Sequence, residues 1–483
     1  MFCHPSNPRS LFDEFWKTWT DDFELLGRRR GVSLDENQLR TMLLLDLEMR
    51  LQSFEKELAS FGLPKPSAED LSKVENIIST DPVVIREEKD YDVEELKATV
   101  DETVNKFTNE QADIFKRVMN AVSQRKPMCA FIDARGGCGK TFLINAILGA
   151  VRSSELGGCV ALAMATTGIA SNLLDLGRTF HSRLKAPLTP TEESTLQISG
   201  QSSLAKLVKM ARVLLIDESP MLDRFLLEAL DRSLRDLMGQ PEQPFGGKII
   251  LLAGDFRQCL PVVPGASRAG TVDHCINQSH LWQHFKVLRL TENMRVRASG
   301  DPVLEAFDQW TLDIGNGSAE NVSIPDEMLT EILSNTKEEP WKEAESMKKF
   351  CQQVFPDIQA NYDKPGWFEG RAILAPTNKE VDSINNMMQE GLPGTGVKLM
   401  SADTLENPTD AFRFNTEYLN TLKPNGFPQH ILDLKPGMPL MLLRNMNPRQ
   451  GLCNGTRMMF NGMVNNKLLR CKIVGSGRLV IIP

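Results

Sequence analysis

The stretch DARGGCGKTF, residues 133–142, decides the fold of this chain. An apolar run ending in FID precedes it, and an amphipathic pattern that begins at KTF follows it. This order predicts a strand, a tight glycine-rich loop and a helix, with backbone N–H groups and the helix N-terminus surrounding phosphate oxygens. We therefore expect Lys140 to contact the β- and γ-phosphates of a nucleotide and Thr141 to bind Mg²⁺.

The loop departs from the usual G-x-x-x-x-G-K-[ST] pattern at one position. Ala134 stands where the first glycine belongs, which costs little if the backbone there has a negative φ. A glycine-rich turn without a ligand is the alternative, and the flanking strand and helix argue against it. The nucleotide-binding residues predicted for the loop are Gly136, Gly137, Cys138, Gly139, Lys140 and Thr141.

Composition limits the class of protein. The 483 residues are 41% hydrophobic and 24% charged, which fits a globular chain of several domains. No apolar run is long enough to cross a membrane, and the N-terminus lacks the pattern of a signal peptide, so we expect neither membrane insertion nor secretion. Nine scattered cysteines without a CxxC pair fit a reducing compartment. His280 and His284 lack a nearby third ligand, which disfavours a metal site there.

Charge is distributed unevenly along the chain. The net charge is −8, but residues 1–106 hold 14 basic and 23 acidic residues, and the remainder holds 41 and 40. Residues 366–483 hold 13 basic and 9 acidic residues. A locally positive groove is therefore compatible with the sequence, so the overall acidity does not exclude a nucleic-acid partner.

Apolar runs alternate with helical patterns from about Phe107 onward, which predicts an α/β fold with a parallel sheet covered on both faces. The predicted strands are MCAFID, CVALAMA, VLLID, KIILLAGD and VLRL. A second group begins with the strand RAILAPTN and the helix KEVDSINNMMQEGL, and the tail predicts hairpins in a small β unit. The predicted segments are a helical acidic flank (1–106), a first α/β domain (107–300), a junction (301–365), a partial second domain (366–436) and a β unit (437–483).

Two further strand ends carry polar side chains. ARVLLIDESPM ends in Asp217 and Glu218, and next to a phosphate loop the first carboxylate can hold Mg²⁺ while the second polarises the attacking water. LLAGDFRQ places Gln258 beyond a strand, where an amide can contact the γ-phosphate and report its loss; a loop capped by Asp255 is the alternative. Arg295, in LTENMRV, is positioned to stabilise transition-state charge, with a surface ion pair as its alternative.

Eight segments occur here in the order and context of one family. They are DARGGCGKTF, ATTGIAS, GRTFHS, LLIDESPM, FGGKIILLAGDFRQCLPVVP, LTENMRV, AILAPTN and LRNMNPRQGLCNGTRM. In these segments the chain resembles the PIF-type (petite integration frequency) DNA helicases of superfamily one, and it looks most similar to the branch encoded by Helitron transposons. The resemblance implies a P-loop NTPase of tandem RecA-like domains with parallel sheets, the second one incomplete, and a C-terminal β insert similar to a Src-homology-three barrel.

The resemblance also implies an activity: ATP hydrolysis driving 5′ to 3′ movement on single-stranded DNA and unwinding at duplex junctions, in DNA repair, recombination, telomere maintenance or transposition. Lys140, Glu218, Gln258 and Arg295 take the catalytic positions, and Gln111 takes the adenine-contacting one. The DNA-contacting motifs correspond to Thr166, Thr167, Gly168, His181 and Ser182, and for His181 a purely structural role is equally open. A nuclear location is expected, and a mitochondrial one remains open. Arg28–Arg30 do not decide between them, because a solvated helix face explains this basic triplet as well as an import signal does.

Some family features do not occur before Pro483. The K-S-Q-G motif, the second arginine finger and the His-x-His pair of the Helitron nuclease are missing, which leads us to expect a C-terminally truncated chain. The second hypothesis is therefore a chain that binds ATP, with or without DNA, but does not unwind duplex DNA. A small-molecule kinase is disfavoured because GDFRQCLP and TENMR would have no role in it. RNA stays open as the track, and the sequence gives no oligomeric state.

Overall fold

The chain divides into two compact units, Met1–Trp310 and Thr311–Pro483, and each is described by itself. The five-segment division expected from the sequence stays a prediction. The computed structural model describes residues 7–20, 23–24, 34–52, 56–66, 70–71, 74, 82–89, 91–154, 160–318, 321–329, 340–364, 366–401, 403, 416–422, 428–443, 446, 451–452, 454–464 and 468–482. Arg28–Arg30 and parts of the segment LRNMNPRQGLCNGTRM, residues 443–458, lie outside these residues.

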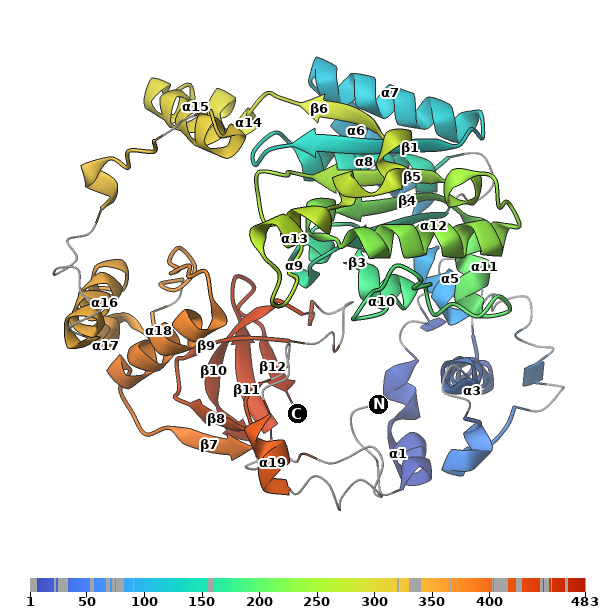
Figure 1. Cartoon of the computed structure of the whole chain (residues 1–483). Coiled ribbons are helices and arrows are strands. Elements are labelled where there is room, and N and C mark those ends of the chain that lie inside the picture. The colour runs from blue at the N-terminus through green and yellow to red at the C-terminus, as the bar shows by residue number, and fades with distance from the viewer. Residues whose placement is uncertain are drawn as a thin grey trace. The chain divides into compact units, whose positions relative to one another are not determined.

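A six-stranded, wholly parallel sheet forms the centre of the first unit (Figure 1). Its strands lie in the order β3-β2-β4-β5-β1-β6. The five strands predicted from apolar runs are confirmed, and the short β3 is an addition that its two-residue length hid in the sequence. The strands are β1 (Met128–Ala134), β2 (Val160–Ala165), β3 (Arg178–Thr179), β4 (Ala211–Asp217), β5 (Ile249–Gly254) and β6 (Lys286–Leu290).

Helices cover both faces of this sheet. Alternate strand residues point to opposite faces, so Ile132 packs with α7 and α8 while its neighbour Phe131 packs with α11 and α12. Val100 of α6 would contact a Cβ at Gly149 of α8 at 2.7 Å, so that glycine permits the close approach of the two helices. The helices are α1 (Pro8–Phe15), α3 (Glu36–Gln52), α5 (Val83–Glu88), α6 (Val93–Val104), α7 (Asn109–Ser123), α8 (Lys140–Arg152), α9 (Gly168–Asn172), α10 (Phe180–Leu184), α11 (Ser203–Met210), α12 (Arg224–Met238), α13 (Arg268–Asp273), α14 (Met294–Ser299) and α15 (Pro302–Asn316).

The described residues of the acidic flank include helices, and α5 packs on the sheet domain. Ile85 of α5 lies in the same core cluster as Phe180 and Leu207. Val83–Glu88 form α5 and Val93–Val104 form α6, and Val100 is buried. Short 3₁₀ turns complete the unit: η1 (Trp16–Trp19), η2 (Leu58–Phe61), η3 (Ser219–Met221), η4 (Pro244–Gly247), η5 (Ile276–Gln278) and η6 (His280–His284).

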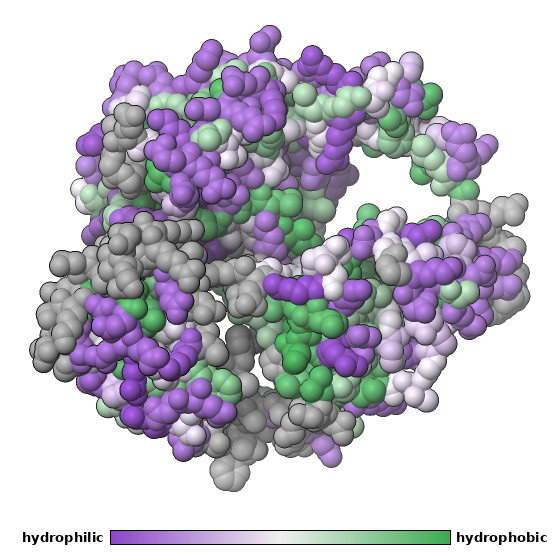
Figure 2. Space-filling model, turned by 180° about the vertical axis from the view of Figure 1, so that it is seen from behind, coloured by the Kyte–Doolittle hydropathy of each residue, from purple (hydrophilic) through white to green (hydrophobic). Residues whose placement is uncertain are grey.

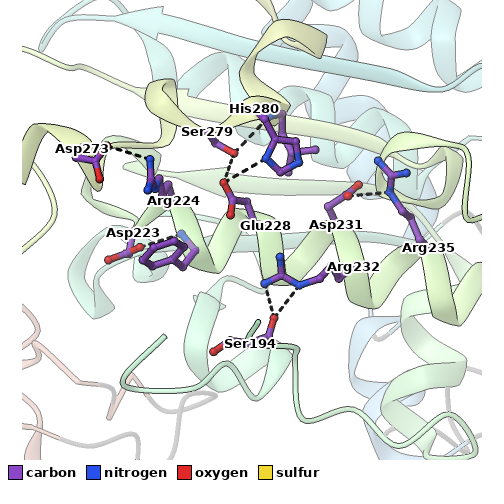
Figure 3. Close-up of polar contacts among 12 residues, drawn as sticks. Ser194, Asp223, Arg224, Glu228, Asp231, Arg232, Arg235, Asp273, Ser279 and His280 are labelled. Atoms are coloured by element: carbon purple, nitrogen blue, oxygen red, sulfur yellow. Dashed lines mark hydrogen bonds and ion pairs between the residues drawn. The ribbon is translucent and has the colours of Figure 1, made fainter. Parts of the chain in front are cut away.

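Helix α12 carries charged side chains that hold its neighbours in place (Figure 3). Glu228, which is buried, accepts a 2.7 Å hydrogen bond from Ser279, with His280 3.5 Å away. Asp231 accepts from the backbone N–H of Phe245 at 2.6 Å. Each contact is internal to the fold, and no group of three or more metal-ligating side chains occurs in the described part of the chain.

The second unit combines helices with two antiparallel sheets. One sheet pairs β7 with β8, and the other has the order β12-β11-β10-β9 around a small core that includes Phe460 and Cys471. Its elements are η7 (Asp326–Met328), α16 (Pro340–Val354), α17 (Ile358–Asn361), α18 (Asn378–Gly391), β7 (Val397–Met400), α19 (Thr416–Thr421), β8 (Ile431–Leu434), β9 (Pro439–Met441), β10 (Arg457–Val464), β11 (Leu468–Ile473) and β12 (Leu479–Ile482).

The prediction for this second unit holds in part. Helix α18 and the terminal hairpins form where the sequence placed them. The strand predicted at residues 371–376 does not form, because no described strand pairs with it, and a strand needs a neighbour to satisfy its backbone groups. A second parallel sheet is accordingly absent from the described residues. Leu374 in this segment is 93% exposed.

The surface is mostly hydrophilic on the face seen in Figure 2, with an apolar area in the lower half of the view. Exposed apolar side chains of the C-terminal sheet include Met441, Leu479 and Ile481. No helix among the described residues is long and apolar enough to span a membrane.

Candidate nucleotide site

The glycine-rich loop joins β1 to α8, as its sequence predicts. Gly137 and Gly139 have φ values of 89° and 75°, which glycine adopts without strain. A Cβ at Gly137 would lie 2.3 Å from Oδ1 of Asn293, and one at Gly139 would lie 2.5 Å from Nε2 of Gln111. Ala134 is the last residue of β1 and has no positive φ, so the departure from the usual pattern is free of backbone strain.

Lys140, the first residue of α8, reaches the end of β4. Its Nζ lies 2.7 Å from Oδ1 of Asp217 and 2.7 Å from Oε1 of Glu218. Burial alone would lower the pKa of Lys140, but the two carboxylates together outweigh it and raise the pKa above its usual value. Three residues selected from two separate sequence motifs therefore meet at one point.

Glu218 has a left-handed backbone, with φ at 52°. This conformation is unfavourable for a residue with a side chain and is often retained at functional sites. Hydrogen bonds surround it: its N–H donates to Oδ1 of Asp217 at 2.8 Å, and its carbonyl accepts from Oγ1 of Thr166 at 3.0 Å. Thr166 thus supports the carboxylate pair, a role that sequence reasoning missed.

The loop after β5 lies against the segment that follows Glu218. A Cβ at Gly254 would be 2.3 Å from Cδ of Pro220, two residues after Glu218. Asp255 is buried and accepts from the backbone N–H of Arg257 at 3.0 Å, so the turn that Asp255 was alternatively expected to cap is present. Gln258 follows this turn, and its Nε2 is 3.5 Å from Oδ2 of Asp255.

Gln111 does not face open space. It is 2% exposed; Oε1 accepts from the N–H of Thr108 at 3.1 Å, and Nε2 donates to the carbonyl of Cys138 at 3.3 Å. Both ends of the amide are therefore bonded to the protein, in a capping box at the start of α7 and to the phosphate loop. Adenine contact by this side chain would need those bonds to break. Thr108 and Gln111 carry the T-x-x-Q signature of a capping box in the sequence itself, whereas the burial of Gln111 is seen only in the fold.

A cavity of about 660 Å³ lies beside the loop. The N–H of one lining residue, Met294, donates to the carbonyl of Gly137 at 2.9 Å, which places the cavity next to the phosphate-binding segment. The lining residues are Lys106, Phe107, Thr108, Asn109, Glu110, Thr291, Glu292, Met294 and Arg297. Arg295, on α14, is exposed, and within the described residues no side-chain ion pair involves it.

The residues expected to contact DNA lie on two adjacent chain segments. Ala165 at the end of β2 pairs with Thr179 at the end of β3. Thr167 caps α9, which begins at Gly168, and Thr179 caps α10 by accepting from the N–H of Ser182 at 3.3 Å. Burial lowers the pKa of His181, so its imidazole is neutral at physiological pH.

Comparison with known proteins shows which proteins this chain resembles. The model of the PIF1-like helicases matches residues 106–324, and the model of the 2B domain of DNA helicase Pif1 matches residues 417–463. An ATP-dependent DNA helicase Pif1 from Psychrobacter sp. is 26% identical over 349 residues, 71% of this chain and 46% of its own length. The PIF1 helicase of Danio rerio is 25% identical, over 70% of this chain and 45% of its own length. The chain thus spans less than half the length of these two relatives.

Solved structures agree in fold. A Bacteroides Pif1 helicase crystallised with ADP-AlF3 and ssDNA has a TM-score of 0.52 at 20% identity, covering 77% of this chain and 73% of its own. The Candida albicans Pif1 helicase has a TM-score of 0.51 at 22% identity, covering 78% of each chain. With two family models matched in chain order and this shared α/β fold, the chain is similar to the PIF1-like helicases over residues 106–324 and to the Pif1 2B domain over residues 417–463.

Proposed function

We propose that this protein is an ATP-dependent DNA helicase that hydrolyses ATP to move 5′ to 3′ on single-stranded DNA and to unwind duplex at junctions. The observation that carries the proposal is the meeting of Lys140, Asp217 and Glu218 beside a glycine loop. Relatives named ATP-dependent DNA helicases support it.

Each polar group has a place in this proposal. Backbone N–H groups of Gly136, Gly137, Cys138 and Gly139 hold phosphate oxygens. Thr141 and Asp217 would hold Mg²⁺, and the ion would neutralise charge that develops on the phosphates. The donor set fits, since a hydroxyl and a carboxylate are the hard oxygen ligands that Mg²⁺ prefers.

Lys140 changes partners in this cycle. Without nucleotide its ammonium is bonded to both carboxylates at 2.7 Å. Nucleotide phosphates compete for that ammonium, and its departure leaves the Glu218 carboxylate able to accept a proton from the attacking water. Gln258 then senses the γ-phosphate, and Arg295 stabilises the transition-state charge.

DNA contacts fall on the two capped segments. The hydroxyls and N–H groups of Thr166, Thr167, Gly168 and Ser182 suit sugar-phosphate contacts, which need no base recognition. His181 contributes as a neutral side chain because its pKa is lowered. Gln111 orients the phosphate loop through the Cys138 carbonyl, in place of the adenine contact expected from the sequence.

The cellular role follows from the same activity. Such a helicase would serve DNA repair, recombination or telomere maintenance, and a Helitron relationship would add transposition. We propose nuclear DNA as its site of action, with mitochondrial DNA as the alternative; imaging of the tagged chain in cells distinguishes the two.

The first experiment measures ATP hydrolysis by the full chain with and without single-stranded DNA, beside Lys140→Ala. DNA-stimulated hydrolysis that Lys140→Ala abolishes is the expected result. Equal rates in the two proteins would contradict the proposal. Unwinding of duplexes with a 5′ or a 3′ single-stranded tail then tests polarity, and RNA tails of the same sequence test the choice of track.

A further inference from the structure

The segment that follows β6 is bonded to the phosphate loop from several sides. The N–H of Met294 donates to the carbonyl of Gly137 at 2.9 Å. Thr291 accepts from Nη2 of Arg135 at 3.3 Å through its carbonyl, and its N–H donates to Glu110 at 2.8 Å. The loop and the start of α14 therefore form one hydrogen-bonded layer, although 156 residues separate Arg135 from Thr291.

Asp308 of α15 joins the two sides of this layer. Its Oδ2 lies 2.9 Å from Nη1 of Arg135 in the phosphate loop. Its Oδ1 accepts from Nδ2 of Asn293 at 2.8 Å. Oδ1 of Asn293 in turn accepts from the backbone N–H of Arg295 at 3.0 Å and so fixes the first turn of α14.

Apolar packing does not explain why α15 lies here. None of its residues is buried, and Val303 is 74% exposed. The Asp308 carboxylate, by contrast, is only 19% exposed and faces a guanidinium of equal exposure. A partly buried charge pair with defined partners on two elements holds its geometry better than an exposed pair does.

We propose that Asp308 is a positioning residue that couples the phosphate loop to Arg295, through Arg135 on one side and Asn293 on the other. The proposal rests on the proposed ATP hydrolysis, because Arg295 acts there on the transition state. When phosphates shift the loop, Arg135 moves with it, and the shared carboxylate transmits this movement to the first turn of α14. Asp308 itself does not touch the nucleotide.

The coupling predicts which kinetic constant changes. Arg295 stabilises the transition state and not the bound substrate, so its misplacement lowers kcat while KM for ATP is retained. In Asp308→Ala we expect kcat about tenfold lower, with KM and the Kd of a fluorescent ADP analogue within about twofold of the wild type. Glu305→Gln, one turn earlier on the same helix and exposed, is the matched control and should retain the wild-type kcat.

A double-mutant cycle tests the pathway. If Asp308 acts through Arg135, then Arg135→Ala with Asp308→Ala should lower kcat little more than the worse single variant, since one contact is lost in both. Asp308→Asn keeps the acceptor for Asn293 and should recover part of the loss. Additive losses, or a rise in KM with unchanged kcat, would overturn the coupling.

Hydrogen exchange gives a readout that does not need hydrolysis. In nucleotide-free Asp308→Ala, the amides of Met294, Arg295 and Val296 should exchange faster than in the wild type, because their acceptors are released. Unchanged exchange would refute the proposed coupling through Asp308. If the proposed ATPase activity is wrong, the wild type will show no Lys140-dependent hydrolysis. The exchange measurement still decides whether Asp308 holds the first turn of α14 in place.

Discussion

Glu88 and Glu87 are adjacent glutamates of α5 whose burial differs sharply. Glu88 forms an ion pair with Arg183 of α10, and their side chains are 2% and 1% exposed. Glu87 pairs with Arg178 at 2.8 Å, with side chains 28% and 40% exposed. Burial lowers the pKa of Arg183 to about 10, which still leaves the guanidinium charged at neutral pH.

Glu88→Gln removes the partner of a buried charge and should destabilise the first unit by about 3–5 kcal/mol. Glu87→Gln removes a pair that is more exposed than Glu88–Arg183, and it should cost about 1 kcal/mol or less. At roughly 2 °C per kcal/mol for a domain of this size, Tm falls by about 6–10 °C in the first variant and by about 2 °C or less in the second.

Thermal unfolding of the full chain, followed by circular dichroism, compares the two variants. Glu88→Leu combined with Arg183→Met serves as the control, because it removes both charges; it should recover most of the lost Tm. Equal Tm values for Glu88→Gln and Glu87→Gln would refute the reasoning that burial makes the Glu88–Arg183 pair the more costly one to break.

Further predictions concern the nucleotide site and its neighbours. Gly137→Ala puts a methyl group against Asn293 at a positive φ, so nucleotide affinity should fall at least about tenfold by equilibrium titration, and unchanged affinity would contradict this geometry. Glu218→Gln should lower hydrolysis by about 10²-fold or more while ADP binding persists; retained turnover would exclude Glu218 as the base. Because the pKa of His181 is lowered in the folded chain, the unfolded chain binds more protons just below pH 6.5, and stability should fall as the pH drops through that range. His181→Asn should reduce this slope in Tm measured against pH, and an equal slope would place the titration elsewhere.

The local sequence predicts most strands of the first unit and its phosphate loop. The strands β1, β2, β4, β5 and β6 were predictable because buried parallel strands are continuous apolar runs. The phosphate loop was predictable because its glycines, Lys140 and Thr141 are neighbours in the chain. Asp217 and Glu218 were predictable because they stand directly at a strand end.

Tertiary structure decided how those pieces are used. The sheet order, which brings Lys140 to a carboxylate 78 residues away, depends on long-range pairing that no local pattern encodes. Gln111 is buried and supports the phosphate loop because its hydrogen-bond partner, the Cys138 carbonyl, comes from another segment. The strand expected at 371–376 failed to form because strand formation needs a partner as well as apolar residues. The contacts Glu88–Arg183 and Asp308–Arg135 likewise arise only in the folded chain, since burial and charge pairing are properties of residues brought together across sequence distance.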